Sequence, residues 1–154
     1  MKLKLTLALI AAACAASAFA NDEKGINDQI KFRQSGYTFM AWNMGRIKAQ
    51  LQNPKPDMKQ IEQAANVIAA IANSGMGALF APGTETGKGW ESTRVKPALF
   101  KEKEEVGKLA GNFKAAAEAL QMDAAGGDAA SVKAAFGKLG EACKACHDKF
   151  REKE

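Results

Sequence analysis

The residues best suited to chemistry in this sequence lie close to its C-terminus, where two cysteines and the only histidine form Cys143-Lys144-Ala145-Cys146-His147. On a helix, Cys143 and Cys146 lie one turn apart on the same face, and His147 follows one turn after Cys143. This Cys-x-x-Cys-His pattern is the attachment signature of a c-type haem, in which each thiol adds across a vinyl group to form a thioether. The sequence therefore predicts one covalent haem c, with His147 as the axial iron ligand.

Two other chemistries use a Cys-x-x-Cys pair. A tetrahedral zinc site needs further ligands, and the chain beyond residue 20 contains no second cysteine or histidine pair. A redox-active dithiol usually begins a helix that follows a strand, and nothing before Cys143 resembles a strand. The haem interpretation is favoured over both, with a chance match as the remaining alternative.

The single histidine limits what can bind on the other side of the iron. With His147 as the proximal ligand, the sixth position must be methionine, an amine, water, a gas molecule or vacant. A histidine-assisted peroxidase mechanism is excluded, because no distal imidazole remains to move protons. The sequence also contains no Gly-rich phosphate loop and no nucleophile–base pairing, so we do not expect an enzyme.

Residues 1–20 have the pattern of a secretory signal peptide, with lysines before an apolar stretch and an Ala-x-Ala cleavage site that ends at Ala20. The apolar run is too short for a membrane span. The alanines before Cys14 match a lipoprotein signal poorly. Cleavage would leave residues 21–154, about 134 residues, as one domain. Export together with the haem motif predicts a protein of the bacterial periplasm.

Charge limits the partners that this chain can bind. The formal net charge is +5. Without the lysines of the signal peptide it falls to about +3, and two haem propionates would bring it to about +1. The basic residues are scattered, so the sequence does not predict a nucleic-acid-binding protein, and a solvated surface accounts for them.

Hydrophobic periodicity predicts four amphipathic helices and no strand. The first helix ends at Pro54 and Pro56, and the second begins with Asp57 as its N-cap and Gln60 as a capping-box partner. A glycine-rich stretch over residues 74–91 predicts a long loop, of a length that often shapes a site. The apolar stripes of these two helices are Ile26, Ile30, Tyr37, Met40, Met44, Ile47 and Leu51, then Ile61, Ala65, Ile68 and Ala72.

The third predicted helix begins near Pro97 and ends before Gly126, and the fourth has Asp128 as its N-cap. Both haem-motif cysteines occupy positions of the fourth apolar stripe, which would insert the haem into the interior. The pattern favours an all-α, antiparallel four-helix bundle whose inward-facing side chains build a cofactor site. The stripes are Leu99, Val106, Leu109, Phe113, Ala117 and Leu120, then Val132, Phe136, Leu139, Cys143, Cys146 and Phe150.

Three segments resemble a known family: Phe32-Arg33-Gln34-Ser35, Phe80-Ala81-Pro82-Gly83-Thr84-Glu85, and the terminal segment from Cys143 to Arg151. They are similar to the class II c-type cytochromes, and specifically to cytochrome c′, over essentially all of residues 21–154. The resemblance implies that Arg33 and Gln34 lie beside the haem, with Arg33 near a propionate. It also implies that Phe80 packs near the haem and that Arg151 lies near the proximal imidazole.

The same resemblance leaves two candidates for the distal pocket. In cytochromes c′ the residue four positions after the arginine blocks the sixth coordination site, and here it is Tyr37. In the related low-spin class II cytochromes a methionine seven positions after the arginine ligates iron. Here that residue is Met40, which also fits the apolar stripe as a gap-filling core residue.

The family pattern favours Tyr37, and with it a five-coordinate iron that binds nitric oxide and carbon monoxide. The resemblance further implies a role in protection from nitrosative stress. The alternative is a low-spin electron carrier with Met40 as the sixth ligand. A periplasmic redox partner stays open under either interpretation.

Three large aromatic residues, Phe32, Phe39 and Trp42, lie off the apolar stripe of the first helix. Exposed apolar clusters often mark interfaces, and a twofold homodimer is the commonest closed arrangement. The resemblance implies dimerisation through the first two helices, while helix rotation or the 74–91 loop could instead bury these rings within one chain. Because Tyr37 lies on the same helix, ligand binding would push that helix and weaken the dimer.

Overall fold

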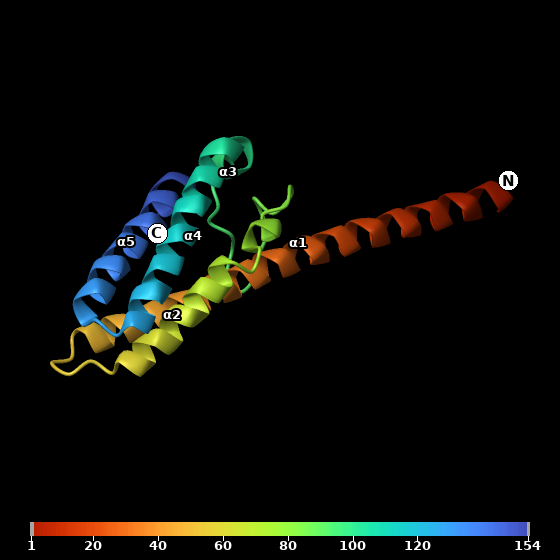
Figure 1. The fold of residues 1–154 in the computed structure, drawn as a ribbon. Coiled ribbons are helices and arrows are strands. Elements are labelled where there is room, and N and C mark those ends of the chain that lie inside the picture. Colours follow the sequence, from red (N-terminus) through yellow and green to blue (C-terminus); the bar gives the residue numbers. More distant parts are fainter. Residues whose placement is uncertain (1, 154) are drawn as a thin grey trace.

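A computed structural model describes the backbone of residues 2–153 and the side chains of residues 23–153 (Figure 1). Within this range the regular secondary structure is helical, with two isolated β-bridges. The helices are α1 (Lys2–Leu51), α2 (Met58–Ala72), the 3₁₀ helix η1 (Met76–Leu79), α3 (Ala98–Lys101), α4 (Lys103–Gly126) and α5 (Ala129–Phe150). The predicted all-α four-helix bundle is confirmed, with α1, α2, α4 and α5 as its long members.

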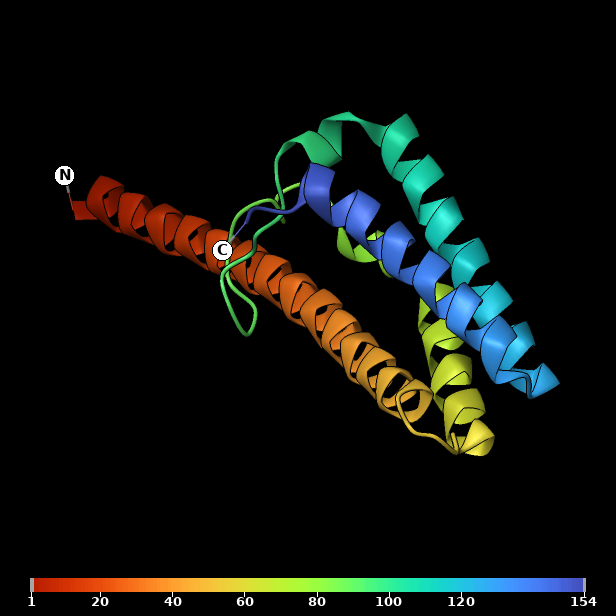
Figure 2. The same ribbon diagram turned by 90° about the vertical axis from the view of Figure 1, so that its left-hand side faces the viewer.

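The long helices pack in chain order, α1 against α2, α2 against α4, and α4 against α5. Figure 2 shows two helical hairpins, α1–α2 and α4–α5, that lie across each other, while the first half of α1 projects away from the bundle. None of the described helices has the length and apolarity needed to cross a membrane. The predicted signal peptide and Cys14 lie outside the described side chains, so the boundary at residue 20 stays a prediction.

The core follows the predicted apolar stripes except at Tyr37, which is 41% exposed and not part of the buried core. Alanines are frequent in it, and their small side chains let helices approach closely, while isoleucine and leucine side chains supply most of the buried apolar area. The cluster of buried residues comprises Met40 and Ile47 of α1, Ile61, Ala64, Ala65 and Ile68 of α2, Ala117, Leu120 and Ala124 of α4, and Val132, Ala135 and Leu139 of α5.

Both predicted N-caps are present, but the capping box differs from the prediction. Asp57 accepts the backbone N–H of Gln60 at 3.1 Å, and the Gln60 side chain donates to the same carboxylate at 2.9 Å. A reciprocal box would place the glutamine side chain on the backbone N–H of Asp57. That N–H donates instead to Gln50 Oε1 at 3.0 Å. At α5, Asp128 accepts the backbone N–H and the hydroxyl of Ser131.

The third predicted helix is not continuous. Glu102 has φ −95° and ψ 55°, outside the helical region, and it separates α3 from α4. The charged run around Glu102 has no apolar side chain to bury, so no packing energy opposes the break. Lys149 of α5 lies 2.7 Å from a Glu102 carboxylate oxygen and 3.7 Å from one of Glu105, which ties the break to the end of the last helix.

Candidate haem site

The haem motif lies on the last turns of α5, as predicted. Cys143 and Cys146 are free thiols and partly buried, and His147 is exposed at the next position. Burial raises the pKa of both thiols, and the neighbouring Cys146 raises that of Cys143 further. The thiols are therefore neutral in this protein at ordinary pH.

Two arginines act on the imidazole of His147. The surrounding protein lowers the pKa of His147, first by desolvation and then through the positive charges of Arg151 and Arg94, while Asp148 opposes them. A neutral imidazole keeps a lone pair available for a metal ion, and a protonated one does not. The cations around His147 therefore favour its ligating form.

Tyr37 lies on α1, opposite the two cysteines of α5. Desolvation raises the pKa of its phenol, and the electrostatic influence of Cys146 and Cys143 adds to this, while Arg33 opposes it. Its ring stands edge-on to Phe80, with centroids 6.4 Å apart and planes at 61°. Tyr37 of α1 thus lies beside Phe80 of the loop after η1 and within electrostatic reach of both thiols of α5, while 41% of the residue stays exposed.

Arg33, one turn before Tyr37, is 3% exposed. Its guanidinium donates to Leu79 O at 3.2 Å, to Thr84 Oγ1 and O at 2.8 and 2.7 Å, and to Thr93 Oγ1 at 2.6 Å. It also lies 4.8 Å from the centre of the Phe80 ring. These hydrogen-bond acceptors are all uncharged, so they do not neutralise the positive charge of Arg33. An anion bound beside this buried cation would therefore be stabilised.

Gln34, the next residue, faces a different part of the loop. Its amide nitrogen donates to Glu91 O at 2.9 Å, and its amide oxygen accepts the backbone N–H groups of Trp90 at 2.8 Å and Glu91 at 3.3 Å. The structure thus gives Gln34 loop partners, and its predicted position beside the haem stays a prediction.

Met40 is 5% exposed and belongs to the apolar core cluster together with residues of α2, α4 and α5. This is the gap-filling role that its place in the apolar stripe predicts. Cys143 packs against the same cluster, and Tyr37 lies within electrostatic reach of both cysteines.

The hydrogen-bond partners of Arg33 could not be predicted from the sequence. Thr84 is fully buried, and Thr93 supplies the shortest of the guanidinium hydrogen bonds. A hydroxyl residue after Pro82-Gly83 was visible in the sequence, but nothing there indicated that its oxygen would meet an arginine of the first helix. Both threonines support the site from the loop.

These residues fit a covalent haem. Two free thiols share a helix face with an imidazole whose pKa is lowered, an aromatic side chain lies within electrostatic reach of the thiols, and the described side chains of residues 23–153 give the buried guanidinium only uncharged hydrogen-bond partners. A haem propionate would supply an anionic partner. The donor set and the charge both suit the group that the pentapeptide predicts.

A family description named Cytochrome C′ matches residues 28–151. The chain belongs to the cytochrome c′ family. Cytochrome c′ of Rhodocyclus tenuis is 57% identical over 127 residues, which cover 82% of this chain and 96% of the relative. Membership implies a covalently bound haem c.

Solved structures of cytochromes c′ agree with this assignment. One, described as showing an unusual ligand-controlled dimer dissociation, has a TM-score of 0.80 and 55% identity, and the match covers 83% of this chain and 97% of that one. Variants of the Alcaligenes xylosoxidans protein with nitric oxide or carbon monoxide bound have TM-scores of 0.74 at 31% and 32% identity. Those matches cover 84% and 83% of this chain, and 97% of each structure.

Proposed function

We propose that this protein is a periplasmic, monohaem cytochrome c′ that binds small diatomic gases, nitric oxide and carbon monoxide, and protects against nitrosative stress without catalytic turnover. Cys143 and Cys146 hold the haem c, and His147 is the axial ligand of a five-coordinate iron. The bound haem supplies an iron centre with an open coordination position. Gas ligands seen in relatives of the same family support the proposal.

The observation that carries this proposal is the difference between the surroundings of Tyr37 and those of Met40. Tyr37 lies within electrostatic reach of both cysteines, whereas Met40 is buried in the core. A phenol held neutral by desolvation crowds the distal side without giving the iron a strong ligand. The aromatic wall of Tyr37 and Phe80 favours small uncharged gases over larger or charged ligands.

The remaining site residues prepare the haem pocket electrostatically. The buried Arg33 cation, which the loop carbonyl and hydroxyl groups hold in one orientation, binds a propionate. Desolvation, together with the charges of Arg151 and Arg94, lowers the pKa of His147 and so favours its neutral form. Both effects need no movement of the protein when the gas binds.

Absorption spectra of the purified ferrous protein, recorded with and without carbon monoxide, test the proposal. We expect a high-spin spectrum that changes to a low-spin one on addition of the gas. A low-spin spectrum without added ligand, with a methionine-to-iron charge-transfer band, would instead identify an electron carrier with Met40 as sixth ligand.

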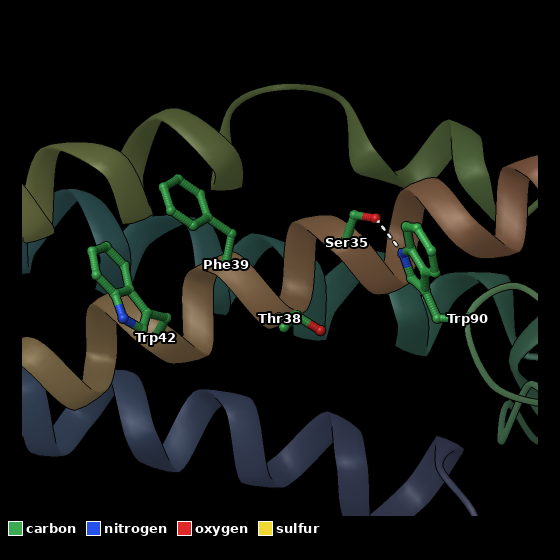
Figure 3. A pocket seen from close by; sticks show the side chains of 5 residues that line it. All are labelled: Ser35, Thr38, Phe39, Trp42 and Trp90. Carbon is green, nitrogen blue, oxygen red and sulfur yellow. Dashed lines mark hydrogen bonds between the residues drawn. The ribbon is translucent and has the colours of Figure 1, made fainter.

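We further propose that the protein forms a homodimer through α1. Phe32, Phe39 and Trp42 are 60%, 50% and 57% exposed, which confirms that these aromatics face outward. The rings of Phe39 and Trp42 stack with centroids 5.6 Å apart. With Ser35, Thr38 and Trp90 they line an open groove of about 550 Å³ (Figure 3). Ligand-controlled dimer dissociation in a relative supports this assignment.

Sedimentation of the haem-loaded protein with and without carbon monoxide tests both assembly and its coupling to the ligand. We expect a dimer without gas and a shift toward monomer with it, because Tyr37 lies on the same helix as the exposed rings. A monomer in both states would contradict dimerisation. A dimer that the gas leaves unshifted would contradict the coupling.

A further inference from the structure

The segment of residues 87–93, here termed the clasp, lies against α1 one turn before Tyr37. Its tip is closed by an isolated bridge between Lys88 and Ser92, and by a backbone hydrogen bond from Thr93 to Gly87 at 3.0 Å. The clasp is therefore a small closed unit, and it contacts the helix as one piece.

The clasp is joined to α1 by side chains of the helix. Asn27 accepts the N–H of Lys88 at 2.9 Å. Gln34 accepts the N–H groups of Trp90 and Glu91 and donates to the carbonyl of Glu91. These contacts span about two helical turns, so the clasp resists sliding as well as lifting.

Trp90 adds a side-chain contact on the outer surface. Its ring is part of a 60% exposed residue, yet its indole N–H donates to Ser35 Oγ at 2.8 Å (Figure 3). Ser35 in turn donates to Lys31 O at 2.8 Å, and the Lys31 ammonium lies 4.3 Å from the centre of the indole. Three groups of α1 therefore hold this exposed tryptophan: the Ser35 hydroxyl, the Lys31 ammonium and the Gln34 amide oxygen.

The fit between clasp and helix is close at Gly89. A Cβ added there would lie 2.6 Å from Lys31 N and 2.7 Å from Lys31 Cα. Real side chains do not approach a backbone this closely, so the loop backbone rests directly on the helix. The clasp therefore follows any movement of this turn of α1, or must detach from it.

Tyr37 lies two residues after Ser35 and three before Met40, and it is 41% exposed. The clasp holds the turn that contains Lys31, Gln34 and Ser35, and Met40 anchors the next turn in the core. Under the proposed function a gas molecule on the distal side meets Tyr37, and any displacement of this part of α1 works against the clasp. A ligand can shift such an equilibrium only by its different affinity for the two states.

We propose that the clasp is a specificity-determining device of the haem site, in which the Trp90–Ser35 hydrogen bond lowers gas affinity by holding the Tyr37 turn in place. This inference rests on the proposed gas-binding function. Trp90 and Ser35 are positioning residues, because they act through Tyr37 and touch neither the gas nor the haem.

Carbon monoxide titration of the haem-loaded, ferrous protein tests the inference with the variants Trp90→Phe and Ser35→Ala. Trp90→Phe removes the indole hydrogen bond to Ser35, and Ser35→Ala removes that bond together with its own bond to Lys31 O, so we expect the carbon monoxide affinity to rise about two- to tenfold in both variants. The double variant should match Ser35→Ala, because the Trp90–Ser35 hydrogen bond is already absent there. Gln121→Ala is the matched control, because it removes one exposed side-chain hydrogen bond, to Asn66 Oδ1 at 2.9 Å, away from α1 and the clasp, and it should leave the affinity unchanged.

Amide hydrogen exchange supplies a second measurement. Its rates in the clasp would not respond to carbon monoxide if the clasp were only a structural contact. Addition of carbon monoxide to the native protein should speed exchange at the N–H groups of Trp90 and Glu91, since both are held by Gln34. Unchanged affinity in Trp90→Phe and Ser35→Ala, or an equal rise in Gln121→Ala, would overturn the inference. A native protein whose spectrum does not respond to carbon monoxide at all would overturn the proposed function instead.

Discussion

Met40 is the residue whose replacement best separates a gas-binding haem protein from an electron carrier. We predict that Met40→Leu and Met40→Ala variants with covalent haem keep the visible absorption spectrum of the native protein. The reason is that Met40 is 5% exposed and packs in the core cluster with residues from α2, α4 and α5. Its thioether then contributes to packing and not to the iron.

The two variants should differ strongly in stability. Truncating a buried methionine to alanine removes its contacts and leaves a cavity, which costs about 2–5 kcal/mol of unfolding free energy. Leucine has nearly the same volume, so its cost stays below about 1.5 kcal/mol. For a domain of this size, the alanine variant should unfold roughly 6 to 20 °C lower, and the leucine variant no more than about 6 °C lower.

The assay pairs an absorption spectrum with a thermal unfolding curve for each variant, and Met44→Leu is the control one turn along α1. Met44 is half-buried and packs against the same cluster, so its replacement reports on packing alone. If Met40 ligated the iron, leucine and alanine would both abolish a low-spin spectrum, whatever their stability. A spectral change in Met40→Leu without a matching loss of stability would refute our reasoning.

Three further outcomes are expected. Replacing Cys143 and Cys146 together by alanine should abolish covalent haem on denaturing gels, and haem retained there would exclude both thioethers. Hydrogen bonds from the first turn of α5 lower the pKa of Asp128, so its cap stabilises the fold above the ordinary carboxyl pKa and loses that effect as pH falls toward the lowered value. Asp128→Ala should therefore lower the unfolding temperature at neutral pH more than in acid, and equal losses would contradict this. Gly89→Ala should lower the unfolding temperature and raise carbon monoxide affinity, because its Cβ would collide with the α1 backbone; an unchanged unfolding temperature would show that the clasp is not in close contact.

The helices and their caps could be predicted because the forces that form them act over a few residues. Asp57 and Asp128 bond to groups three positions away, and the stripes that end at Leu51 and Phe150 follow the helical period directly. The break at Glu102 could not be predicted in this way. The stripe from Leu99 to Leu120 continues on both sides of it, and the ion pairs with α5 that accompany the break depend on the tertiary fold.

The haem attachment motif could likewise be predicted from the sequence, since its chemistry is contained within five consecutive residues. The partners of Arg33 could not, because Thr84 and Thr93 lie 51 and 60 positions away, in a loop without periodicity. Glycines at 87 and 89 marked that loop as irregular, but only the folded chain brings its backbone onto α1. Long-range contacts of this kind carry no local signal.

Arg33 and Gln34 illustrate how one short motif serves two purposes. Consecutive side chains on an α-helix point about 100° apart, so adjacent residues meet different neighbours. Arg33 turns inward, where Thr84 and Thr93 hold its cation, and Gln34 turns toward Trp90 and binds the clasp. Both contacts hold the same loop to the same turn of α1. The turn of α1 that carries the buried Arg33 is therefore also the turn that the clasp restrains. Residues that never touch the gas thus restrain the helix that carries Tyr37.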